Sequence, residues 1–207
     1  MRIILTSALA AGSLLLGGCS SDPAPAASKT PAVRKGPVIP TGPITALTAY
    51  YEMYKVARNW APDVQTASLT GSDAGDVKGA EGKFPKWTAI FVSPSKQMSQ
   101  TYTYSTVEEG STLKGFNNEG SKRWAGASQA AEPFSNSDFS VDSDAAWKAA
   151  SEKAKDWLAK NPGKEITAFA LGHSSRFPVP MWYILWGTKA SGYAAFVNAS
   201  TGKIFGK

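Results

Sequence analysis

The chain has very few of the side chains on which catalytic and metal sites depend. Its 207 residues include one cysteine, Cys19, and one histidine, His173. A single cysteine cannot form a disulfide within the chain, and these two residues supply too few ligands for a typical zinc site. The sequence also lacks a Gly-x-Ser-x-Gly nucleophile elbow and a phosphate-binding glycine motif. We therefore expect a protein that is not an enzyme and that holds neither a metal nor a cofactor.

Two clusters could still carry chemistry. His173 stands at the end of a predicted strand, beside Ser174 and Ser175. A catalytic Ser–His pair is one interpretation, but adjacent residues in a strand point to opposite faces, which favours an ordinary histidine in an exposed turn. A Gly-rich loop carries Asp73, Asp76 and Glu81. Its spacing is not that of an EF-hand, so a solvated loop is favoured over a calcium site.

Residues 1–18 have the pattern of an exported leader. Arg2 precedes an apolar stretch from Ile3 to Leu16, and Gly17-Gly18-Cys19 follows. A positive start, an apolar core and a small-residue cleavage site are typical of signal peptides. The apolar stretch is shorter than the roughly 20 residues of a transmembrane helix. An ordinary secretory leader with a chance cysteine is the other interpretation.

The run Leu16-Gly17-Gly18-Cys19 resembles a bacterial lipobox. The resemblance implies a lipoprotein in which Cys19 becomes the acylated N-terminus, with palmitate-like chains holding the protein to a membrane. Two acyl chains are enough for stable attachment. Ser20 follows the cysteine, and similarity to sorting signals implies the outer membrane of a diderm bacterium. In a monoderm bacterium the anchor would lie in the cell membrane, and in both hosts the protein would face the periplasm or the cell exterior.

Composition divides the remaining chain. Residues 19–43 are rich in proline, alanine and serine, which predicts a flexible tether because few apolar side chains are available for burial. The patterns that follow predict a first helix-sheet unit over residues 44–108, a linker over 109–141 and a second unit over 142–207. The linker is Gly-, Ser- and Asn-rich, and it could add a strand or cover a sheet.

The positive charge of the chain is spread out. The formal net charge is +6, but Arg34-Lys35 and Lys122-Arg123 are the adjacent basic pairs. Nucleic-acid surfaces need clustered charge, and export also argues against such a partner. We therefore expect no nucleic-acid binding. The expected partners are the membrane, through Cys19, and an envelope protein or an anionic polymer.

The two predicted units have the same order of elements. Each has an amphipathic helix, ending near Trp60 in the first and before Asn161-Pro162-Gly163 in the second. Three strands follow each helix, predicted at residues 64–69, 87–93 and 100–107, and at 166–172, 181–186 and 193–198. Both middle strands open with a Pro-x-Trp motif that contains Trp87 or Trp182. We predict an α+β fold of two similar units, each with one helix packed on a three-stranded antiparallel sheet.

The second half also carries a family resemblance. The strand 180–186 and the segment Tyr193 to Ile204, with its Asn198-Ala-Ser-Thr-Gly-Lys203 turn, resemble a PepSY-type domain. The resemblance implies a cystatin-like fold and an association with peptidase modulation at the cell surface. Asn198 and Lys203 stand where the family has acidic residues, so only the geometry of the turn is expected to be retained, with Gly202 at positive φ.

Two functions follow as expectations. The first is a non-enzymatic, lipid-anchored binding or regulatory protein of the cell envelope, acting on a peptidase or binding a surface polymer. The second is a carrier that holds a small ligand or glycan on an aromatic platform, for which the candidate residues are Trp87, Trp124 and Trp182. Burial of these rings in the core is the structural alternative to a platform.

Overall fold

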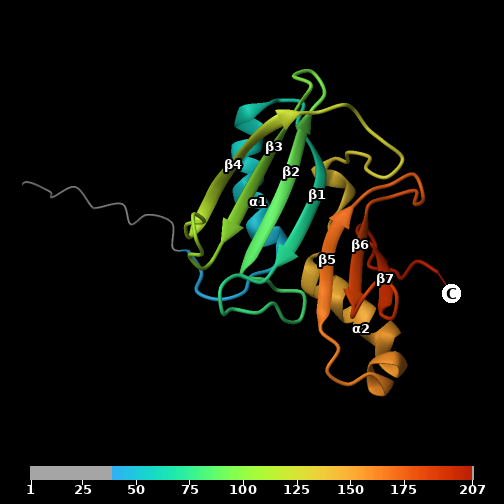
Figure 1. The fold of residues 1–207 in the computed structure, drawn as a ribbon. Helices are drawn as coiled ribbons and strands as arrows, with labels where there is room; N and C mark the ends of the chain where they lie inside the picture. The colour runs from blue at the N-terminus through green and yellow to red at the C-terminus, as the bar shows by residue number, and fades with distance from the viewer. Residues whose placement is uncertain (1–38, 207) are drawn as a thin grey trace, which may run out of the picture. The chain divides into compact units, whose positions relative to one another are not determined.

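Seven antiparallel strands form one continuous sheet in the computed structural model, which describes residues 39–206. The strand order is β4-β3-β2-β1-β5-β6-β7 (Figure 1). The strands are β1 (Gln65–Ser72), β2 (Lys86–Ser93), β3 (Met98–Ser105), β4 (Gly115–Arg123), β5 (Ile166–Gly172), β6 (Met181–Trp186) and β7 (Tyr193–Asn198). The α+β class predicted from the sequence is confirmed.

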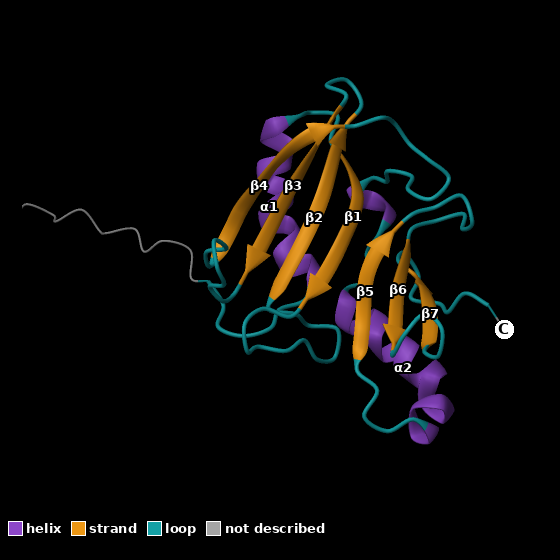
Figure 2. Ribbon diagram, in the orientation of Figure 1, coloured by secondary structure: helices purple, strands orange, loops and turns teal. Residues whose placement is uncertain are grey.

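Two α-helices cover one face of this sheet. The helix α1 (Ala46–Trp60) packs on β1, β2 and β3, and α2 (Ser143–Lys160) packs on β6 and β7 (Figure 2). A 3₁₀ helix, η1 (Asn136–Asp138), precedes α2. The buried side of each helix follows the three- and four-residue spacing seen in the sequence, because that stripe faces the sheet. Among residues 39–206, no α-helix packs on the opposite face of the sheet (Figure 2).

The prediction of two separate three-stranded sheets is wrong. β1 and β5, the first strands of the two halves, pair in antiparallel register with Leu69 opposite Leu171. Each would otherwise leave a row of backbone N–H and C=O groups without partners, and their pairing satisfies both rows. The segment predicted as a linker also contributes β4, so four strands precede α2 in the chain and three follow it.

The two Pro-x-Trp tryptophans make the same contact in their own halves. Trp87 Nε1–H donates to the carbonyl oxygen of Ile44 and Trp182 Nε1–H donates to that of Val141, each at 2.9 Å. Each acceptor stands two residues before the first residue of its helix. The two rings also contact each other edge to face, with centroids 6.3 Å apart, and both are fully buried. The tryptophans therefore fix each helix start to its strand and join the two halves at the centre of the core.

The N-termini of the two helices share one set of capping groups. Thr45 precedes α1 but makes no capping hydrogen bond through its side chain. Instead, Ala46 N–H donates to Ser143 Oγ at 2.8 Å and Leu47 N–H donates to Asp142 Oδ1 at 2.9 Å. Asp142 Oδ1 also accepts from Ser143 N–H at the start of α2. Residues that begin the second helix therefore satisfy backbone donors that the first helix leaves open.

The turn after β7 has the predicted geometry. Asn198 Oδ1 accepts hydrogen bonds from the backbone N–H groups of Ser200 and Thr201, each at 2.9 Å. Gly202 has a φ of +72°, as the sequence suggested. The chain then turns back, and Ile204 pairs with Val197, so the C-terminal segment covers part of the β7 edge.

Candidate functional site

An apolar cleft of about 270 Å³ lies at the junction of the two halves. Its lining comes from β1 and β5, from Met181 and Tyr183 on β6, and from Phe196 on β7. Side chains alternate along a strand, and Trp182 and Ile184 point into the helix-covered core, so Met181 and Tyr183 lie on the opposite face. The cleft is therefore on the helix-free face, and we call it the junction cleft.

Small residues create the depth of the junction cleft. Ala67 and Ser68 line it from β1, where the pairing with β2 is irregular, and Ala170 and Gly172 line it from β5. A Cβ added to Gly172 would have no atom within 4 Å. Larger side chains at these four positions would fill the space between the sheet and the loops above it.

Two loops pack together at the rim of the junction cleft. Glu132 N–H donates to the carbonyl oxygen of His173 at 3.0 Å. The N–H and hydroxyl of Ser175 both donate to the carbonyl oxygen of Gln129, at 2.9 and 3.1 Å. The segment before η1 and the loop after β5 are thus bound to each other beside the cleft, to which both contribute lining residues.

His173 takes part in this loop contact. Its Nε2 lies 3.1 Å from the carbonyl oxygen of Phe177, which can only accept, so Nε2 carries the proton in that bond. Its Nδ1 lies 3.5 Å from Glu132 Oε2. The Ser175 hydroxyl bonds Gln129, and within residues 39–206 neither Ser174 nor Ser175 bonds the imidazole. The described geometry therefore places His173 between two loops, without a serine nucleophile as its partner.

Aromatic rings form the wall of the junction cleft on the β7 side. The centroid of Phe196 is 5.0 Å from that of Phe177 and 5.2 Å from that of Tyr183. The guanidinium of Arg176 lies 5.3 Å from the Phe196 centroid, within cation–π range. This wall combines a broad apolar surface with one positive charge at its edge.

The prediction of an aromatic platform made by three tryptophans is wrong for Trp87 and Trp182. Trp87 and Trp182 are fully buried beneath the helices, because their rings fill the core and their indole N–H groups bond the helix starts. Trp124 is half-buried and lines a different cleft, beside the β2–β3 hairpin. Cys19 lies outside the described residues. The three rings therefore form no common surface.

In the acidic loop between β1 and β2, the carboxylate of Asp73 bonds other residues of the same loop. Asp73 accepts from Gly79 N–H at 2.7 Å and pairs with Lys78 at 3.1 Å, a contact that raises the pKa of Lys78. No group of three or more metal-ligating side chains occurs in the described part of the chain. Asp73 is thus engaged within the loop itself.

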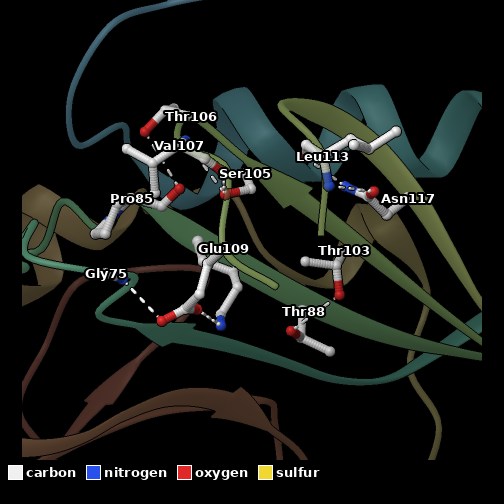
Figure 3. A network of polar contacts seen from close by, with 11 residues as sticks. Gly75, Pro85, Thr88, Thr103, Ser105, Thr106, Val107, Glu109, Leu113 and Asn117 are labelled. Atoms are coloured by element: carbon white, nitrogen blue, oxygen red, sulfur yellow. Dashed lines mark hydrogen bonds and ion pairs between the residues drawn. The ribbon is translucent and has the colours of Figure 1, made fainter. Parts of the chain in front are cut away.

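Glu109 fixes that loop to the end of β3 and the start of β2. It accepts from Gly75 N–H at 2.8 Å (Figure 3). It also pairs with the Lys86 ammonium at 2.8 Å. The hydrogen bond from Lys86, followed by that from Gly75, lowers the pKa of Glu109. This carboxylate is therefore committed to a structural contact that is separate from the junction cleft.

Comparisons with known proteins give one likeness of overall structure. No protein-family model and no curated protein matches the chain. A crystal structure of a candidate lipoprotein from Clostridium difficile aligns with a TM-score of 0.43 and 10% sequence identity, over 76% of this chain and 90% of that one. Across residues 39–206, no helix is both long enough and apolar enough to cross a membrane.

The junction cleft was not predicted from the sequence, although one signal for it exists. The strand 181–186 is apolar at every position, and a strand that faces solvent on one side normally alternates with polar residues. Met181 and Leu185 are indeed buried on the helix-free face. That face is covered in part by the loop that directly precedes β6 and in part by Ala130 and Ala131 from before α2, and the packing of such loops has no periodic signature.

Proposed function

We propose that the chain is a non-enzymatic binding protein of the cell envelope, held at a membrane surface by a lipidated Cys19 and a flexible tether. In this proposal the junction cleft receives an apolar group of the partner. The observation that carries the proposal is the cleft itself, a preformed apolar hollow with small residues at its base and aromatic residues on one wall. Binding sites occur preferentially where two structural units meet.

The polar groups at the rim support binding over catalysis. His173 and Glu132 face each other, and the second nitrogen of His173 bonds a backbone carbonyl. A general base or nucleophile needs a free position toward a substrate. The pair is better suited to holding the two loops together than to transferring a proton.

The partner that we favour is an envelope protein that inserts one apolar side chain. A volume of about 270 Å³ is sufficient for a large side chain and too small for a long lipid. The resemblance to PepSY-type domains makes a peptidase a reasonable choice of partner. The matching contacts of Trp87 and Trp182 support descent of the two halves from one duplicated unit, which would also explain why a hollow forms where they join.

Replacing Gly172 by leucine tests the cleft. The new side chain has free space to enter, and a glycine in a strand is unfavourable by roughly 0.5–1 kcal/mol, so stability should be equal or higher. We expect the variant to bind the apolar dye 1-anilinonaphthalene-8-sulfonate at least about tenfold more weakly than the parent, since one well-filled apolar contact corresponds to that factor. Dye fluorescence titration and thermal unfolding provide the two measurements.

Ala194→Leu is the matched control, because Ala194 is exposed on β7 and does not line the cleft. It adds the same side chain to the sheet and should leave dye binding unchanged. Equal dye binding by the parent and Gly172→Leu would show that the junction cleft is not a binding site. Crosslinking in envelope extracts, compared between the same two variants, then identifies the partner.

Replacing Cys19 by serine tests the anchor. Without the thiol no diacylglyceryl group can be attached. We expect the parent protein to incorporate a labelled fatty acid and Cys19→Ser to incorporate none, as measured by metabolic labelling and by the mass of the N-terminal peptide. Ser20→Ala is the control and should be labelled like the parent. Labelling of Cys19→Ser equal to that of the parent would contradict the anchor.

A further inference from the structure

A second cleft, of about 350 Å³, lies at the end of the β2–β3 hairpin. Pro94 and Gln97 line it from the hairpin, and Arg123 and Trp124 line it from the end of β4. Trp124 N–H donates to the carbonyl oxygen of Gln97 at 2.9 Å, which holds the two segments together. We call this site the Trp124 cleft.

The surroundings of the Trp124 cleft are basic. Lys96 belongs to the same hairpin, where its ammonium lies 5.3 Å from the centroid of Trp60 and donates to the Trp60 carbonyl oxygen. Lys122 precedes Arg123 and lies opposite Ser99 on β3. Among residues 39–206, the ion pairs do not include Lys96, Lys122 or Arg123. Arg123 therefore brings a positive charge to the cleft, and Lys96 adds a second one on the same hairpin, whereas Lys122 alternates to the other face of β4.

Asp63, between α1 and β1, accepts hydrogen bonds from this hairpin, so its carboxylate is occupied by the protein itself. Asp63 Oδ1 accepts from the Ser93 hydroxyl at 2.6 Å, and Oδ2 accepts from Ser95 N–H at 2.7 Å. The bond from Ser93, followed by that from Ser95, lowers the pKa of Asp63 to about 2. No carboxylate is among the residues that line the Trp124 cleft, so an anion entering it meets an amide, an indole and a guanidinium.

We propose that the Trp124 cleft binds an anionic polysaccharide of the cell envelope. Indole rings stack on the apolar faces of sugar rings, and the side-chain amide of Gln97 can both donate to and accept from hydroxyl groups. The guanidinium of Arg123 matches the oxygens of a sulfate, phosphate or carboxylate substituent, and Lys96 on the hairpin attracts a further charge along the polymer. This site is separate from the junction cleft and goes beyond the function proposed above.

A polysaccharide is favoured over a single-stranded nucleic acid, although both would use an aromatic ring and cations. The leader pattern of residues 1–18 directs the chain out of the cytoplasm, where sugar polymers are the abundant polyanions. The basic residues are few and local, and they do not form the long stripe that tracks a nucleic-acid backbone.

The test uses the full mature lipoprotein in detergent micelles and three probes: dextran sulfate, neutral dextran and oligothymidylate. We expect dextran sulfate to bind best, with affinity about tenfold lower in Trp124→Ala and in Arg123→Gln, the loss typical of one stacking or charge-assisted contact. Lys148→Gln is the charge-matched control, since Lys148 is exposed on α2, and it should change affinity less than about twofold. Binding is measured by fluorescence anisotropy at fixed salt.

Two results would overturn the proposal. Equal affinity of the parent and Trp124→Ala for dextran sulfate would show attraction by charge alone. Tighter binding of oligothymidylate than of dextran sulfate, with the same dependence on Trp124, would assign the cleft to nucleic acid. Gly172→Leu should bind dextran sulfate as tightly as the parent does. A wrong proposal for the Trp124 cleft can therefore be told apart from a wrong proposal for the junction cleft.

Discussion

Trp182→Ala is expected to lower the free energy of unfolding by about 3–5 kcal/mol, the range for removing a fully buried aromatic ring. The ring is 0% exposed and contacts Trp87 and Phe169, with centroids 6.3 and 5.5 Å away. Truncation also leaves the carbonyl oxygen of Val141 without the indole donor that lies 2.9 Å from it. Urea unfolding followed by far-ultraviolet circular dichroism measures the change.

Trp124→Ala is the control for this prediction, because Trp124 is half-buried and lies outside the core. We expect Trp124→Ala to lower the free energy of unfolding by less than about 1 kcal/mol, as for most surface substitutions. Combining Trp182→Ala with Trp87→Ala should cost less than the sum of the two single changes, since the rings contact each other. A loss below about 1 kcal/mol in Trp182→Ala would contradict the central role given to the ring.

Local patterns predicted most of the secondary structure. The strands 166–172, 181–186 and 193–198 have the predicted bounds, and α1 ends at Trp60 as predicted. Proline, glycine and helix-capping residues mark these ends directly in the sequence. β3 is displaced by two residues from its prediction, because the Pro94–Gln97 turn is shorter than the sequence suggested.

The way the strands combine into a sheet could not be predicted in the same way. β4 is mostly polar, with Asn117, Asn118 and Glu119 exposed or half-exposed, so it has no apolar alternation to reveal it. It is held by backbone hydrogen bonds to β3, which any sequence can supply. The pairing of β1 with β5 also depends on unsatisfied strand edges, and these leave no pattern in either strand.

For the candidate sites too, the sequence identified residue types, and only the fold showed which of them are exposed. The sequence singled out Trp124 because of its residue type, and the structure places it in a cleft with Arg123. The sequence also singled out Trp87 and Trp182, and these are core residues. The Pro-x-Trp motif therefore marks a packing role, and only the fold separates an exposed indole from a buried one.

Gly82→Ala is expected to destabilise the protein by at least about 3 kcal/mol, because it combines an unfavourable backbone conformation with an unrelieved clash. Gly82 has a φ of +76°, and a Cβ there would lie 2.3 Å from the carbonyl oxygen of Ser143 and 2.8 Å from the Cα of Asp144. Both are backbone atoms in the first turn of α2, and the Ser143 hydroxyl caps α1. Relief of the clash would move the shared start of both helices.

Gly163→Ala separates the conformational cost from the steric clash in the expected loss of stability. Gly163 has a φ of +79°, nearly the same as Gly82, but a Cβ there would have no atom within 4 Å. It should therefore show only the conformational cost of about 1 kcal/mol. The difference between the two variants in urea unfolding measures the steric part. Equal losses would mean that the start of α2 can shift freely, and the capping of one helix by the other would then contribute little to holding the two halves together.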